Sequence, residues 1–163
     1  MTKAAAKPVR VINPNRPLRK GGFEYVDLFR AGRNERILII KTGLQASEAK
    51  RILAGLSLPK GETMRALNLS VATFNRKVAQ HQALGPEETE RVLGVAKLVG
   101  QVQAMVEESG NAEGFNAEKW VSQWLREPIP ALDGQRPIDL LDTMEGQALV
   151  SETLARMQSG AYA

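Results

Sequence analysis

The chain holds few of the side chains that carry out covalent or metal chemistry. It has no cysteine and one histidine, His81. The missing cysteines exclude disulfides, thiolate nucleophiles and cysteine-ligated metal sites, and a single histidine excludes most histidine metal clusters. The acidic pairs Glu87/Glu88 and Glu107/Glu108 are neighbours in predicted helices, so their carboxylates point in different directions. We therefore expect no enzymatic activity, no bound metal and no cofactor, and we interpret His81 as a surface or capping residue.

Side chains suited to nucleic-acid recognition gather instead on one predicted helix, residues 71–80. Apolar residues at spacings of three and four form one side of this helix, and polar residues fill the rest. Arg76 can bind guanine with two hydrogen bonds, and Asn75 or Gln80 can bind adenine, while the hydroxyls and the lysine suit phosphate. An amphipathic helix with an ordinary charged outer face is the alternative. The predicted DNA-binding set is Ser70, Ala72, Thr73, Asn75, Arg76, Lys77 and Gln80.

The segment before this helix predicts another helix, joined to it by a tight turn. Residues 59–67 have helical spacing, Asn68–Ser70 form a tight turn, and Ser70 can cap the following helix by accepting from its first backbone N–H groups. Two helices joined in this way form a helix-turn-helix, whose second helix enters the major groove of DNA.

Charge is divided between the two halves of the sequence. The 163 residues carry a net charge of +4, but residues 1–80 contain 16 Lys and Arg against 5 Asp and Glu, a balance of +11. Residues 81–163 contain 6 against 13, a balance of −7. Such segregation favours a polyanionic partner for the basic half and a different partner for the acidic half. The alternative is that both are merely solvated faces.

The remaining pattern predicts an all-α fold. Residues 33–42 suit either a helix closed by Gly43 or a short buried strand, and we favour the helix. Ser47 is the expected cap of a helix that reaches Leu56. The longest helix is expected at Pro86–Glu107, and shorter ones follow at residues 117–126, 137–141 and 143–158. The predicted organisation is a flexible basic arm at 1–22, a helix-turn-helix domain at 23–108 and a small helical domain at 109–163.

The last fifty residues carry many large apolar side chains for so short a helical unit. Either a partner chain covers part of them, or they pack on the long helix at 86–107. The longest apolar run in the sequence is four residues, Ile37–Ile40, and the basic N-terminus lacks the apolar core of a signal peptide. We therefore expect a cytoplasmic protein with no membrane partner.

Several segments taken together resemble the Xre/MbcA/ParS antitoxins of RES–Xre toxin–antitoxin modules. The resemblance runs from about residue 44 to the end and is most specific in the C-terminal half. The family commonly has two adjacent basic residues where this sequence has Asn75 and Arg76. The segments that carry the resemblance are Leu69–Lys77, Leu84–Val92, Trp124–Pro128, Leu132–Leu141, Thr143–Gly146 and Leu154–Gly160, with Val150.

The resemblance implies an Xre-like DNA-binding domain followed by a toxin-binding domain. The partner would be a RES-domain toxin that degrades NAD, held with its active-site cleft covered. The antitoxin would also repress its own operon by binding operator DNA, as a homodimer within the complex. Residues 161–163 would reach toward the cleft, with Arg156 and Tyr162 as polar contacts. The toxin-binding set implied is Trp124, Leu132, Arg136, Pro137, Leu141, Met144, Leu154, Arg156 and Tyr162.

Two other functions remain open at this point. The first is a free-standing helix-turn-helix regulator of transcription whose C-terminal unit serves only for dimerisation. The second is a hydrolase or transferase that uses His81, for which no substrate suggests itself.

Overall fold

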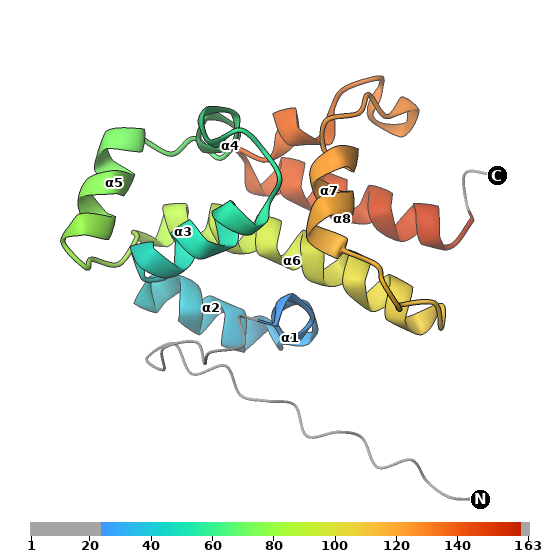
Figure 1. Cartoon of the computed structure of the whole chain (residues 1–163), viewed down its shortest axis with the longest axis horizontal. Helices are drawn as coiled ribbons and strands as arrows, with labels where there is room; N and C mark the ends of the chain where they lie inside the picture. The colour runs from blue at the N-terminus through green and yellow to red at the C-terminus, as the bar shows by residue number, and fades with distance from the viewer. Residues whose placement is uncertain (1–23, 161–163) are drawn as a thin grey trace, which may run out of the picture.

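The computed structural model describes residues 24–160, and these residues form helices and no strand (Figure 1). The predicted all-α fold is therefore confirmed. The predicted arm at 1–22 and Tyr162 lie outside the described residues. The helices are α1 (Tyr25–Arg30), α2 (Arg33–Thr42), α3 (Ala46–Gly55), α4 (Lys60–Ala66), α5 (Val71–Ala79), α6 (Pro86–Glu108), α7 (Ala117–Trp124) and α8 (Met144–Gln158), with the short 3₁₀ helices η1 (Pro130–Leu132) and η2 (Pro137–Leu140).

Helix α6 is the centre of the fold. Figure 1 shows it running through the middle of the molecule, with α1 and α2 on one side and α7 and α8 on the other. Its 23 residues are apolar on most of their circumference, so neighbours can pack on it from several directions. Gly100 permits the closest approach, because a Cβ there would lie 1.9 Å from the carbonyl oxygen of Tyr25 on α1. The expected apolar stripe at Val92, Val95, Ala96, Val99 and Val102 is buried, and Val106 is half-buried.

Residues 33–42, whose sequence suited either a helix or a short buried strand, form helix α2. It is a helix closed by Gly43, which has φ of +87° and donates its N–H to the carbonyl of Ile39 at 2.9 Å. A left-handed φ favours glycine at this position, as expected from the sequence.

The start of α3 differs from its prediction. Gln45, rather than Ser47, precedes the helix, because the Ala46 N–H donates to the carbonyl of Gln82 at 3.0 Å. Gln45 itself pairs with Ala83, and this contact between segments distant in sequence fixes the chain two residues before the expected cap.

Residues on both sides of the predicted boundary at 109 share one hydrophobic core. It extends from Leu28 on α1 to Leu154 on α8, and α6 contributes to it along most of its length. Most of the large apolar side chains of the C-terminal region pack there, so packing on α6 accounts for them, and Met144, Leu149 and Met157 remain exposed. Between residues 24 and 160, no helix has the length and apolar character needed to cross a bilayer.

Candidate functional site

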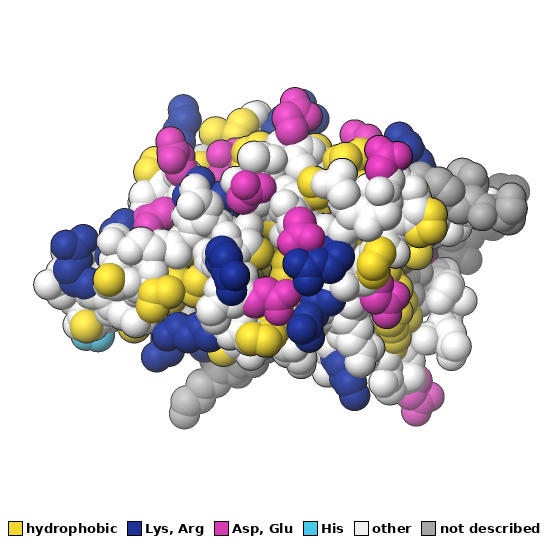
Figure 2. All heavy atoms as spheres, turned by 90° about the horizontal axis from the view of Figure 1, so that it is seen from above, with side chains coloured by type: hydrophobic (Ala, Val, Ile, Leu, Met, Phe, Trp, Pro, Cys, Tyr) yellow, Lys and Arg dark blue, Asp and Glu magenta, His cyan; other side chains and the backbone are white. Residues whose placement is uncertain are grey.

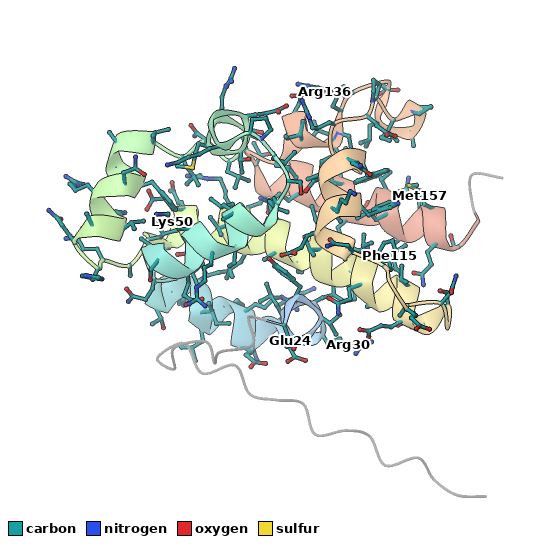
Figure 3. The ribbon with its side chains drawn as sticks, viewed as in Figure 1. Glu24, Arg30, Lys50, Phe115, Arg136 and Met157 are labelled. Atoms are coloured by element: carbon teal, nitrogen blue, oxygen red, sulfur yellow. The ribbon has the colours of Figure 1, made fainter. Side chains whose placement is uncertain are left out.

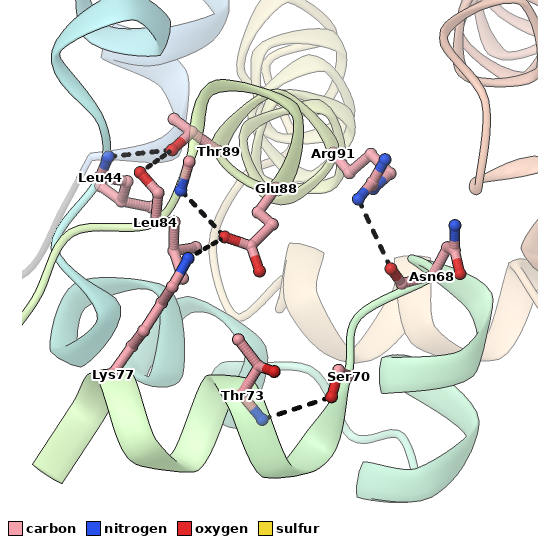
Figure 4. Close-up of polar contacts among 10 residues, drawn as sticks. Leu44, Asn68, Ser70, Thr73, Lys77, Leu84, Glu88, Thr89 and Arg91 are labelled. Atoms are coloured by element: carbon pink, nitrogen blue, oxygen red, sulfur yellow. Dashed lines mark hydrogen bonds and ion pairs between the residues drawn. The ribbon is translucent and has the colours of Figure 1, made fainter.

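Helices α4 and α5 form the expected helix-turn-helix. The chain turns at Asn68, which has φ of +49°, and the Leu69 N–H donates to the carbonyl of Met64 at 2.8 Å. Ser70 caps α5 as expected, since its Oγ accepts from the Thr73 N–H at 3.3 Å (Figure 4). The turn thus directs α5 away from α4.

One face of α5 is anchored and the other is open. Phe74 is buried in the core, whereas Ser70, Ala72, Asn75, Arg76 and Gln80 of the predicted DNA-binding set are exposed and Thr73 is half-buried. Arg76 takes part in none of the ion pairs found among residues 24–160. An exposed arginine on a presented helix suits base recognition.

Lys77, whose sequence position predicts a phosphate contact, forms an ion pair within the chain. Its Nζ lies 2.6 Å from Glu88 Oε2, which also accepts the Gly85 N–H at 2.9 Å (Figure 4). Burial by itself would raise the pKa of Glu88, but the hydrogen bonds from Lys77 and Gly85 outweigh it and lower that pKa. The ammonium group is therefore engaged within the chain, where it ties α5 to the start of α6.

Lys60 is a candidate DNA contact that the sequence reading did not single out. It is exposed at the start of α4, and its Nζ donates to Asn75 Oδ1 of α5 at 3.3 Å. A lysine at the start of the first helix of a helix-turn-helix was the available signal, because that helix crosses the DNA backbone. Figure 2 shows Lys and Arg side chains, with few acidic ones, at the end of the molecule where α5 lies.

His81 lies just beyond α5, exposed and with φ of +53°. Its N–H donates to the carbonyl of Val78 at 3.3 Å, which closes the end of the helix. Within residues 24–160 no three His, Cys, Asp or Glu side chains come together as metal ligands. His81 thus occupies the surface position that its sequence context predicts.

The second candidate surface lies over α8 and the loops before it. Arg136 and Met144 are accessible there, as is Arg156, which pairs with Glu152 at 3.7 Å. Leu149, which the sequence reading left out of the contact set, is exposed on the same helix. It is one of the few large apolar side chains of α8 that α6 does not cover. This exposure follows from how α8 packs on α6, so the sequence alone does not show it.

Five residues of the predicted toxin-binding set lie inside the molecule. All five side chains are buried, and those of Trp124, Leu141 and Leu154 belong to the hydrophobic core that α6 shares. Their burial favours a role in supporting the surface over direct contact with a partner, and their part in toxin binding stays a prediction. The five are Trp124, Leu132, Pro137, Leu141 and Leu154.

Two buried glutamines fix α8 on α6. Gln101 Nε2 donates to the carbonyl of Ser151 at 2.9 Å, and Ser151 Oγ donates back to Gln101 Oε1 at 2.7 Å. Gln147 Nε2 donates to the carbonyls of Arg91 and Leu141 at 3.1 and 2.9 Å. Because buried amides are costly unless paired, these contacts fix how α8 is presented.

Comparison with known proteins assigns a family domain to each of the regions that carry these surfaces. Residues 35–97 match the model of the antitoxin Xre-like helix-turn-helix domain. Residues 103–160 match the antitoxin Xre/MbcA/ParS C-terminal toxin-binding domain. The chain belongs to the Xre/MbcA/ParS antitoxin family. The first match ends and the second begins within α6, so this helix carries part of both domains.

Curated relatives agree with this assignment. The "Prs ADP-ribosylating antitoxin" of Sphingobium sp. (strain YBL2) is 56% identical over 141 residues, which cover 86% of this chain and 89% of the relative. Antitoxin Xre of Yersinia enterocolitica is 28% identical over 76% of this chain and 78% of its own length. Antitoxin Xre of Photorhabdus laumondii is 21% identical over 75% and 77%. The antitoxin therefore joins a DNA-binding helix-turn-helix to a domain that binds and neutralises a toxin.

Proposed function

We propose that this antitoxin neutralises a RES-family toxin that degrades NAD, by covering the toxin's active-site cleft, and that it represses its own operon. The observation that carries the proposal is the presence of two separate accessible surfaces, on α5 and on α8, in the two family domains. The name of the Sphingobium relative couples an antitoxin to ADP-ribosylation, and NAD is the usual donor of ADP-ribose. An NAD-consuming toxin fits that name.

The toxin contact centres on the exposed part of the C-terminal domain. Arg136, Met144 and Arg156 of the predicted set form it together with Leu149. The family resemblance adds Tyr162, which lies outside the described residues, as a polar contact with the cleft. An exposed leucine beside charged groups is typical of an interface that buries an apolar centre within a polar rim. The operator contact centres on Arg76, Asn75 and Lys60, and a homodimer would place two such helices on a symmetric site.

The test is inhibition of the toxin's NAD consumption by antitoxin variants. Leu149→Gln places a polar group at the centre of the proposed interface without entering the core. We expect it to weaken inhibition at least tenfold, equivalent to about 1.4 kcal/mol. Ile37→Gln on α2 is the matched control, because both residues are 41% exposed. Equal inhibition by the two variants would place the toxin contact elsewhere.

Repression is tested with a reporter fused to the antitoxin's own promoter. The wild-type antitoxin should repress the reporter, and Arg76→Ala should relieve repression while retaining inhibition of the toxin. A free-standing regulator would repress the reporter and leave the toxin active. The match of residues 103–160 to a toxin-binding domain favours the antitoxin.

A further inference from the structure

A hollow of about 190 Å³ lies where α3, α4 and α5 meet. Leu56, Met64 and Phe74, which line it, are buried, and Leu53 is half-buried. Apart from Thr63 and two lysines, all the side chains that line the hollow are apolar. An apolar cavity of about 150 Å³ in another protein holds a benzene molecule, so this hollow has room for one ring or a branched aliphatic group.

Lys50 of α3 and Lys60 of α4 are the two lysines of the hollow. Both are exposed, whereas Met64 and Phe74 are buried, so the charged groups lie toward solvent and the apolar groups lie inward. Figure 3 shows Lys50 between α3 and α5. Among residues 24–160 neither lysine takes part in an ion pair, and no Asp or Glu lines the hollow. Lys60 donates to Asn75 Oδ1 at 3.3 Å, which leaves further N–H groups of its ammonium for a ligand.

Hydrogen bonds within the chain hold the walls of the hollow. The Ser57 N–H, in the connection between α3 and α4, donates to Ser122 Oγ of α7 at 3.0 Å. Ser122 is buried, and its hydroxyl donates in turn to the carbonyl of Glu118 at 2.6 Å. Thr63 Oγ1 donates to the carbonyl of Pro59 at 3.1 Å, so this hydroxyl already has an acceptor. The hollow is therefore formed before any ligand arrives, as is usual for small-molecule sites.

The lining selects a ligand with two different ends. The apolar interior favours an aromatic or branched aliphatic group, because burying such a group removes apolar surface from water. The two ammonium groups favour a carboxylate at the opening, since hydrogen bonds between charged partners are the stronger ones. A plain inorganic anion has nothing to place in the apolar interior, and a neutral apolar molecule makes no use of the lysines.

We propose that this hollow binds a small apolar carboxylate. Its ring or branched chain lies against Met64 and Phe74, and its carboxylate accepts from Lys50 and Lys60. The site requires neither the toxin nor the operator, so this inference goes beyond the proposed function and is tested separately from it.

The experiment uses the full chain alone, with phenylacetate as the probe. Titration followed by NMR of the backbone amides measures the Kd and shows which residues respond. For a ligand of about ten non-hydrogen atoms we expect a Kd of about 1 mM or below, with the largest shifts in the residues of α3, α4 and α5 that line the hollow. Phenylacetamide, which has the same shape without the charge, should bind about fivefold more weakly. Acetate, which lacks the ring, should bind at least about tenfold more weakly.

The double variant Lys50→Gln/Lys60→Gln removes both charges at the opening and leaves the apolar wall intact. It should weaken phenylacetate binding about fivefold and keep phenylacetamide binding within about twofold of wild type. Lys41→Gln/Lys119→Gln is the matched control, because it removes two exposed lysines that do not line the hollow. This control should bind phenylacetate as the wild type does, whereas a general effect of net charge would weaken both double variants equally.

Each of the other results overturns the proposal. Acetate that binds as tightly as phenylacetate would indicate a plain anion site. Phenylacetamide that binds as tightly would indicate an apolar cavity in which the lysines have no part. Binding of phenylacetate that does not saturate below about 10 mM, shifts centred on other helices, or equal losses in the two double variants would exclude a carboxylate site in this hollow. None of these results bears on toxin neutralisation or on operator binding.

Discussion

Helices α5 and α8 present their functional faces by opposite means. Helix α5 is short, contributes one fully buried side chain and is tied to α6 by the Lys77–Glu88 pair. Helix α8 is longer and buries Val150 and Leu154 completely. Two buried glutamines, Gln101 of α6 and Gln147 of α8, fix it in place. The proposed DNA-binding face therefore depends on a few polar contacts of α5, whereas the proposed toxin-binding face depends on the core of the whole molecule.

This difference explains why removal of the chain after Gly146 is a poor way to separate the two functions. Such a truncation would take Val150 and Leu154 out of the core that α6 shares with the helix-turn-helix. Both functions would then fail through loss of packing. Substitutions on exposed residues test each face without that complication.

The largest expected effect comes from Leu154→Ala on α8. Leu154 is fully buried, so the change should lower the free energy of unfolding by about 2–5 kcal/mol, through lost burial and the cavity left behind. Leu149→Ala, at an exposed position of the same helix, should change it by less than about 0.5 kcal/mol. Denaturant unfolding of the two variants gives the comparison, and similar losses would place Leu154 outside the supporting core.

A smaller effect is expected on DNA from Arg76→Ala on α5. Loss of a base contact should weaken operator binding by about 1–3 kcal/mol and relax the preference for one base pair. Because Arg76 is exposed, the free energy of unfolding should stay within about 0.5 kcal/mol of wild type. Binding to the operator and to variants with single base changes measures both quantities. Unchanged affinity and preference would remove α5 from the major groove.

The smallest effect concerns the pH dependence of the Lys77–Glu88 contact. The pKa of Glu88 is lowered in the folded state, so its charged form stabilises the fold above the ordinary glutamate pKa. That contribution, of the order of 1 kcal/mol for a part-buried pair that water still reaches, is lost as the pH falls through the lowered value.

Lys77→Met removes the main partner of Glu88, so the free energy of unfolding of this variant should depend less on pH in the acidic range than that of the wild type. Lys41→Met on exposed α2 is the control and should leave the profile unchanged. Unfolding measured between about pH 3 and pH 7 makes the comparison, since that range spans the ordinary glutamate pKa. Parallel profiles for wild type and Lys77→Met would show that the contact does not stabilise the fold.

Local signals predicted the elements well where neighbours in sequence decide the structure. Ser70 caps α5, Gly43 closes α2, and α6 begins at Pro86 after Gly85, because caps, left-handed turns and proline act within a few residues. The cap expected at Ser47 failed because Gln45, two residues earlier, pairs with Ala83 beyond α5. That pairing has no local signal.

In the candidate sites, too, local features were predicted from the sequence and contacts between distant segments were not. The helical spacing of residues 71–80 correctly placed Phe74 and Val78 on the packed side of α5, since one helix determines its own periodicity, but Val71 of the same apolar side is 46% exposed. It did not reveal that Lys77 would meet Glu88, nor that Lys60 would lie beside Asn75. In the C-terminal domain, apolar character alone could not distinguish side chains that pack on α6 from those left exposed.

The sequence by itself determined an all-α chain of this antitoxin family, with a basic helix-turn-helix and an apolar C-terminal region. Composition, helical period and capping are properties of residues close together in the chain, so they are readable without a structure. Only the tertiary structure decided that one helix supplies a core to both domains, which apolar groups stay exposed, and that Glu62 lies between Arg126 and Arg136. These features depend on contacts between segments far apart in sequence, and such contacts are set by packing of the whole molecule.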